Sequence, residues 1–140
     1  MLTQLLYFSE VRDLGPGGAG WLLEQARAKN KLACLTGVLL FNQDYFVQCL
    51  EGGREKLTDV FGAIAADDRH AHVTLMSVHD IAERDFPDWS MGFVSSTTAL
   101  RTTLLRFFPS EEFKPGTMSS ASVTALMKCL RSMECLAGTQ

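Results

Sequence analysis

A predicted β-hairpin over residues 36–52 constrains this chain more than any other segment. Two apolar runs flank Asn-Gln-Asp at positions 42–44, which is typical of an antiparallel hairpin deep in a sheet. Because strand side chains alternate, Gln48 shares a face with Phe46 and Leu50 and is expected to be buried. Leaving a buried amide without hydrogen-bond partners costs about 1–3 kcal/mol. The sequence therefore predicts a polar partner for Gln48, either structural or functional.

Length and composition predict a single globular domain. The chain has 140 residues, of which 46% are hydrophobic, and a mean hydropathy of +0.06, which argues against disorder. A net charge of −3 and a pI near 5.5 provide no positive field for a phosphate backbone, so a nucleic-acid partner is not expected. We find neither a signal peptide nor a membrane span, and we expect a cytoplasmic protein with no membrane partner.

The sequence does not predict a metal site or a disulfide. His70 and His72 straddle a predicted helix-to-strand boundary, and no His spacing places two ligands on one helix face. The cysteines form no C-x-x-C pair and are expected to be reduced thiols that act as small hydrophobes. They are Cys34, Cys49, Cys129 and Cys135.

The apolar periodicity predicts a ferredoxin-like α+β fold with the order βαββαββ. Helices over 21–30 and 54–66 are expected on one face of the sheet, and C-terminal helices over 99–108 and 121–137 on the other. The apolar, Met-rich stripe of the last helix fits core packing or, alternatively, a partner-facing surface. The expected strands are 2–9, the two strands of the hairpin, 72–79 and 89–94.

Three uncharged polar side chains are predicted to converge between the two helices. Tyr7 lies on the first strand, Asn30 on the inward stripe of the first helix, and Gln48 on the hairpin. Such a cluster in an apolar pocket suits a planar heterocycle with donors and acceptors along its edge. Two other interpretations remain open: a structural polar core in a flavin-free oligomeric adaptor, and a small acylphosphatase-like enzyme. The enzyme needs an anion-binding loop with an Arg in place, which we do not find.

Five short motifs follow one another in a characteristic order. They are Tyr7 in Leu-Leu-Tyr-Phe-Ser, Asn30 six positions before Thr36-Gly37, Gln48 in Phe-Val-Gln-Cys-Leu-Glu-Gly, Asp67-x-Arg69-His70, and Trp89-Ser-Met91. Over residues 1 to about 95 this pattern resembles the BLUF family of blue-light sensors, and in particular its short, single-domain members. The resemblance implies a flavin-binding domain over 1–97 and a C-terminal helical extension over 98–140, packed on the sheet.

The resemblance also implies a cofactor and its contacts. BLUF domains hold FAD noncovalently between two helices, with FMN or riboflavin as alternatives. Gln48 would lie between the Tyr7 hydroxyl and the flavin N5 and O4 edge, and Asn30 would hold the pyrimidine side. Further cofactor contacts are implied for Asp67, Arg69 and His70, and a phosphate contact for Lys29, which replaces a His or Asn of relatives.

The implied activity is light sensing rather than enzymatic catalysis. Tyr7 passes an electron to the excited flavin, a proton moves through Gln48, and recombination leaves the Gln48 amide rotated or tautomerised. The family's small red shift and its dark reversal follow from the altered hydrogen bond. The signal is expected to pass through the strand holding Trp89 and Met91 to the C-terminal helices, and then to an unknown, separate partner protein. A homo-oligomer is left open.

Overall fold

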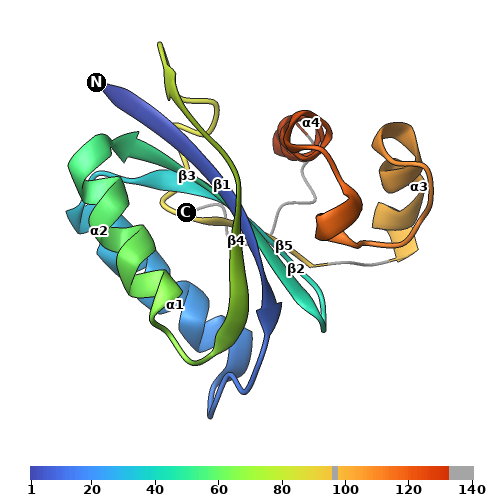
Figure 1. Ribbon diagram of the computed structural model, residues 1–140, viewed down its shortest axis with the longest axis horizontal. Helices are drawn as coiled ribbons and strands as arrows, with labels where there is room; N and C mark the ends of the chain where they lie inside the picture. The colour runs from blue at the N-terminus through green and yellow to red at the C-terminus, as the bar shows by residue number, and fades with distance from the viewer. Residues whose placement is uncertain (96–97, 133–140) are drawn as a thin grey trace.

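The protein folds around a five-stranded sheet with helices on both faces (Figure 1). The computed structural model describes residues 1–95 and 98–132. Strand order is β4-β1-β3-β2-β5; β2 and β5 are parallel and all other neighbours antiparallel, which confirms the predicted ferredoxin-like α+β fold. The elements are β1 (Leu2–Val11), α1 (Gly18–Leu32), β2 (Thr36–Phe41), β3 (Tyr45–Gly53), α2 (Arg54–Ala65), β4 (His70–Ile81), β5 (Gly92–Ser95), α3 (Thr98–Phe107), the 3-10 helix η1 (Pro115–Thr117) and α4 (Ser120–Arg131).

The predicted hairpin is formed by β2 and β3. Its turn is closed by Asn42, whose Oδ1 accepts hydrogen bonds from the backbone N–H groups of Asp44 at 2.8 Å and Tyr45 at 2.7 Å. At the other end of β2, a Cβ on Gly37 would lie 2.0 Å from the backbone oxygen of Cys49. Only glycine allows the two strands to approach so closely there.

Alternation along β3 divides the core into two layers. Phe46 and Leu50 pack with residues of β1, α1 and α2, whereas Val47 and Cys49 pack against the C-terminal helices. Figure 1 shows α1 and α2 on one side of the sheet and α3 and α4 on the other. Gln48 belongs to the α1 and α2 side by the same alternation and is 5% exposed, so its predicted burial is confirmed.

Helix α4 covers the second face of the sheet with its apolar stripe. Its first turn is capped by Ser119, whose Oγ accepts a hydrogen bond from the Ser122 N–H at 3.1 Å. The stripe is core packing over the described part of the helix, where the side chains are at most 1% exposed. The buried residues are Val123, Leu126, Met127 and Leu130, while Met133 falls outside the described residues.

The structure differs from the sequence-based expectation at three places. The last strand begins at Gly92, so Trp89 and Met91 precede β5 and do not lie within it. Cys34 is not a buried small hydrophobe: it is exposed and adopts a left-handed conformation (φ 56°) between α1 and β2. The helix predicted over 121–137 is described only as far as Arg131, and Cys135 lies outside the described residues.

Two features are absent from residues 1–95 and 98–132. Among them, no helix has both the length and the apolar character needed to cross a bilayer. The same ranges contain no grouping of three or more His, Cys, Asp or Glu side chains able to hold a metal ion.

Candidate functional site

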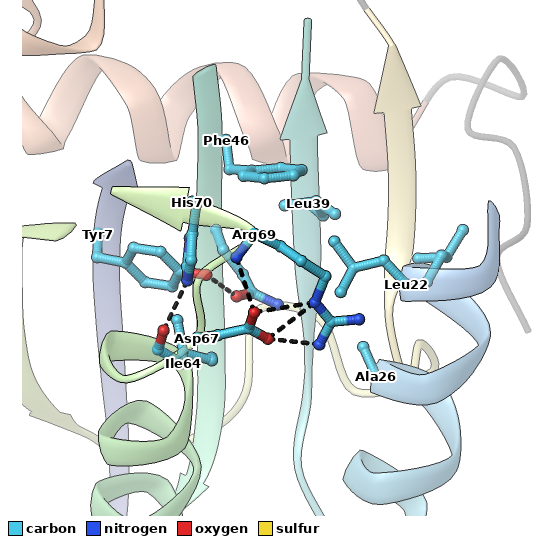
Figure 2. Close-up of a pocket in the computed structure, with 11 residues that line it drawn as sticks. Tyr7, Leu22, Ala26, Leu39, Phe46, Ile64, Asp67, Arg69 and His70 are labelled. Carbon is cyan, nitrogen blue, oxygen red and sulfur yellow. Dashed lines mark hydrogen bonds and ion pairs between the residues drawn. The ribbon is translucent and has the colours of Figure 1, made fainter. Parts of the chain in front are cut away.

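An apolar cavity lies between α1, α2 and the sheet (Figure 2), and its lining includes Tyr7 and Gln48. Its lining is mostly apolar with a few polar side chains, as is typical of a small-molecule site. A second cavity adjoins it and shares part of its wall. Between them, the two cavities are lined by all seven predicted cofactor-binding residues, Tyr7, Lys29, Asn30, Gln48, Asp67, Arg69 and His70.

Tyr7 and Gln48 contribute uncharged polar groups to the first cavity. They lie directly opposite each other on the neighbouring strands β1 and β3, and the Tyr7 hydroxyl donates a hydrogen bond to Gln48 Oε1. Both side chains are buried. Burial raises the pKa of Tyr7 far above its usual value, and the negative charge of Asp67 raises it further. The phenol is therefore held as a neutral hydrogen-bond donor.

The amide nitrogen of Gln48 contacts Met91. Nε2 lies 3.4 Å from Sδ of Met91, which is a weak acceptor, so the amide retains capacity for a stronger acceptor in the cavity. Trp89 instead packs on the opposite side of the sheet, where its ring stacks on Phe86 with a centroid separation of 5.9 Å. Sequence reasoning did not decide which of these two residues lies beside Gln48; the structure assigns Met91.

Helix α1 holds the segment that carries Met91. Asn30 Nδ2 donates to the backbone oxygen of Ser90 at 2.8 Å, and Arg27 Nε donates to that of Met91 at 3.1 Å. Sequence reasoning identified Asn30 and missed the role of Arg27. The available signal was spacing, because residues three apart lie on the same helix face.

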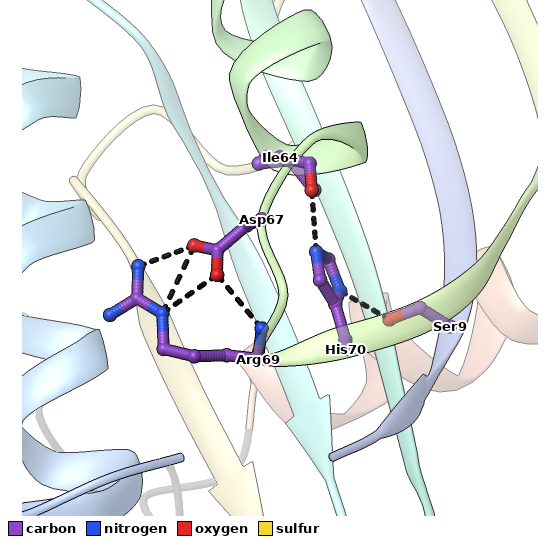
Figure 3. Close-up of polar contacts among 5 residues, drawn as sticks. All are labelled: Ser9, Ile64, Asp67, Arg69 and His70. Carbon is purple, nitrogen blue, oxygen red and sulfur yellow. Dashed lines mark hydrogen bonds and ion pairs between the residues drawn. The ribbon is translucent and has the colours of Figure 1, made fainter. Parts of the chain in front are cut away.

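Asp67 and Arg69 form an ion pair on the cavity wall (Figure 3). The hydrogen bond from Arg69 lowers the pKa of Asp67 to about 2, so the carboxylate stays ionised at neutral pH. The Arg69 guanidinium also lies 5.0 Å from the ring centroid of Trp21 on α1. These contacts fix a positive group beside the cavity.

His70 is held by the protein at both ring nitrogens (Figure 3). Nε2 lies 2.6 Å from the backbone oxygen of Ile64, so it must carry a proton and donate it to this acceptor. Nδ1 lies 2.7 Å from Oγ of Ser9, a buried residue of β1. The imidazole therefore joins β1 to the last turn of α2, and it offers the cavity its ring surface rather than an unbonded nitrogen.

The cavity suits a flat heterocycle that has apolar faces and a polar edge. Aliphatic and aromatic side chains supply most of the wall, and the amide of Gln48 belongs to the lining. A family model described as sensors of blue light using FAD matches residues 2–92. The chain belongs to the BLUF family.

Two solved BLUF structures resemble this chain over nearly its full length. The photo-activated state of BlsA is 28% identical, has a TM-score of 0.84, and the match covers 96% of this chain and 98% of that one. The dark state of BlrB is 32% identical, has a TM-score of 0.74, and the match covers 91% and 92%.

The curated relatives are much longer than the region they share with this BLUF chain. The blue light- and temperature-regulated antirepressor BluF of Escherichia coli K12 is 38% identical over 74 residues, which is 52% of this chain and 18% of BluF. The chain thus spans less than a fifth of this relative. The matched enzymes likewise share only a small part of their length with this chain, 13% in the photoactivated adenylate cyclase subunit beta of Euglena longa.

Family membership decides among the three interpretations of the polar cluster. The chain is a blue-light sensor that uses a flavin, and neither the flavin-free adaptor nor the acylphosphatase-like enzyme is retained. FAD is the cofactor named for the family. The residues fit this group chemically, since apolar walls accommodate the ring faces and amide side chains match a ring edge of alternating donors and acceptors.

Proposed function

We propose that Tyr7 and Gln48 form the light-driven switch of this BLUF sensor. The supporting observation is the hydrogen bond from the buried Tyr7 hydroxyl to Gln48 Oε1 in the lining of the cavity. A phenol can give up an electron and a proton together, and an amide can present either its oxygen or its NH₂ group to the same neighbour. The pair thus has the chemistry needed for a reversible change without a permanent bond.

The remaining cavity residues would hold the cofactor. Asn30 would bind the pyrimidine side of the ring through its amide. The positive groups of Arg69 and Lys29 suit the negatively charged portion of FAD, while Asp67 keeps Arg69 in place. His70 would contribute ring contact, because its nitrogens are already bonded.

When bound, the flavin absorbs blue light and acts as an electron acceptor in its excited state. Tyr7 would supply the electron, and Gln48 would relay the hydroxyl proton toward the bound cofactor and back again. When charge returns to Tyr7, the Gln48 amide remains rotated or tautomerised until dark reversal. Since every proton and electron returns, no reaction product leaves the site.

Rotation of the Gln48 amide would change its contact with Met91. Before rotation, Nε2 faces the Met91 sulfur; after rotation the amide oxygen faces it, and two acceptors then repel each other. We propose that the displaced Met91 moves the adjoining Trp89, which packs with the C-terminal helices. In this scheme residues 1–97 form the sensor domain, and 98–140 form an extension that receives the signal.

BLUF proteins act on effector domains or on partners, as the antirepressor name of BluF indicates. We propose that this chain acts in the cytoplasm on a separate protein, alone or as a homo-oligomer, through its C-terminal helices. A pull-down that compares illuminated with dark protein tests this part of the proposal. Equal capture of every partner in light and darkness would contradict it.

An absorption spectrum tests the sensor directly. Purified protein should be yellow, with the bands of oxidised flavin, and blue light should shift those bands to longer wavelength. The shift should reverse in darkness over repeated cycles. Flavin-loaded protein whose spectrum does not change under illumination would contradict the proposed switch.

A further inference from the structure

Strand β3 carries a second buried polar side chain, on the face opposite Gln48. Glu51 is 0% exposed, and its carboxylate is bonded entirely within the protein. Oε2 accepts from Gln4 Nε2 at 2.8 Å and from the Asp85 N–H at 2.9 Å, and Oε1 accepts from the Phe86 N–H at 2.8 Å. A charged group is retained in a core when its lone pairs are satisfied in this way.

The residues that Glu51 binds are also those on which the end of α4 docks. Arg131 donates to the backbone oxygen of Asp85, and its guanidinium lies 5.9 Å from the Phe86 ring centroid. Lys128 Nζ lies 3.5 Å from the Asp85 carboxylate. The last turn of α4 is therefore joined to β3 by polar contacts through Asp85 and Phe86, in addition to the apolar packing of α4 on β3.

This stretch begins the 85–91 connection, which ends at the Gln48 contact. At its start, Glu51 bonds two consecutive backbone N–H groups; at its end, Met91 lies against Gln48. Trp89 lies between these points and stacks on Phe86. Strand β3 thus holds the connection at both ends, once from each face of the sheet.

We propose that Glu51 is the positioning residue through which the light-induced change at Gln48 reaches α4. Displacement of Met91 moves the 85–91 connection about its anchor at Glu51, and Asp85 passes this movement to α4. Without the hydrogen bonds to Glu51, residues near Met91 would shift while Asp85 and α4 stay in place. The 85–91 connection has two arrangements in this scheme. The state of the Gln48 amide and the position of α4 both shift the equilibrium between them. This inference rests on the proposed function of Tyr7 and Gln48.

The substitution Glu51→Gln tests the anchor in the full, flavin-loaded chain. The glutamine side chain has the same shape as Glu51 but only one acceptor oxygen. Its NH₂ group would face groups that are themselves donors, Gln4 Nε2 or the backbone N–H groups of residues 85 and 86, so at least one of the present hydrogen bonds is lost. Two measurements are made on each variant: the light-induced absorption shift, and hydrogen exchange of the α4 amides (120–131) in darkness and in light. We expect an unchanged absorption shift and at least about a fivefold fall in the light-minus-dark difference in α4 exchange.

A matched control and a second variant make the outcome decisive. Asp80→Asn removes a β4 carboxylate that contacts Thr3 and Arg54 and should leave the α4 response intact. If Glu51→Gln does not fold, Lys128→Met combined with Arg131→Met removes the contacts of α4 with Asp85 instead. This double variant should also abolish the α4 response.

Each result supports or overturns the anchor. A role confined to stability would change α4 exchange equally in light and darkness and preserve the difference, which would overturn the proposal. A wild-type protein that shifts its spectrum without any α4 response would also overturn it. Absence of the spectral shift in the wild-type protein would instead count against the proposed switch.

Discussion

The side-chain nitrogen of Gln48 lies 3.4 Å from the sulfur of Met91, and this contact joins the cavity to the segment that precedes β5. Met91 is completely buried, so it has little room to move independently of its backbone. Its backbone oxygen is in turn bonded to Arg27 of α1. A change at the Gln48 amide that displaces the Met91 side chain must therefore also move the backbone that carries it.

Replacing Tyr7 by Phe should abolish the light-induced red shift while flavin stays bound. The phenyl ring fills the same apolar space but supplies no hydroxyl to Gln48 Oε1. The unmet acceptor should lower the free energy of unfolding by about 1–3 kcal/mol. Absorption spectroscopy and denaturant unfolding measure the two effects. Tyr45→Phe is the matched control, because Tyr45 packs on the other layer of the core. Undiminished photocycling in Tyr7→Phe would rule out the proposed role of Tyr7 and Gln48.

Replacing Gln48 by Glu should also abolish the reversible switch. An ionised carboxylate only accepts hydrogen bonds, so rotation cannot exchange a donor for an acceptor. Repeated cycles of blue light and darkness, followed by absorbance, check this outcome. Gln43→Glu makes the same change at an exposed position of the hairpin turn and should cycle normally. A Gln48→Glu protein that still cycles would show that the amide is dispensable.

Replacing Met91 by Leu should separate the spectral change from its transmission. Leucine conserves the buried volume at a cost below about 1.5 kcal/mol, yet it removes the sulfur that contacts Gln48. We expect the red shift to persist and the light-induced change in hydrogen exchange of α4 to be lost. Met76→Leu on β4 controls for the loss of a thioether elsewhere. Retention of the full α4 response in Met91→Leu would argue against this route.

Acid should weaken the fold partly through Asp67. The pKa of Asp67 is about 2 in the folded protein, against an ordinary value of 3.8, because Arg69 stabilises the carboxylate. A lowered pKa adds stability above pH 3.8, and this stability is lost as the pH falls toward 2. Since the pair is partly exposed, the contribution should stay below about 1 kcal/mol. Unfolding free energies measured from pH 6 to 2 should fall less steeply in Asp67→Asn, and parallel curves would contradict the assignment.

Replacing Gly37 by Ala should destabilise the hairpin by more than about 1 kcal/mol. The new Cβ would lie 2.0 Å from the backbone oxygen of Cys49. Relieving this clash requires a shift of the β3 backbone, which would weaken its strand pairing. Gly62→Ala is the matched control, since its Cβ meets no atom within 4 Å and alanine favours a helix by roughly 0.5–1 kcal/mol. Thermal unfolding measures both. Similar melting temperatures for Gly37→Ala and the wild-type protein would contradict the close approach.

Sequence patterns were sufficient where local periodicity determines the structure. Alternation in the hairpin correctly placed Gln48 among buried apolar side chains, and helical spacing correctly placed Asn30 on the inner face of α1. The order of elements followed from the same periodicities. The start of the last strand did not, because Trp89, Ser90 and Met91 are all buried and alternation gives no boundary there.

The sequence by itself determined the order of strands and helices, the buried position of Gln48 and the family motifs. Only the tertiary structure decided that Met91 rather than Trp89 contacts Gln48, and that Glu51 is fully buried. The physical reason is sequence separation. A carboxylate enters a core only with donors to satisfy it, and two of those that bind Glu51 come from backbone 34 and 35 residues further along the chain. No local sequence pattern predicts these hydrogen bonds, because the two segments come together only in the folded protein.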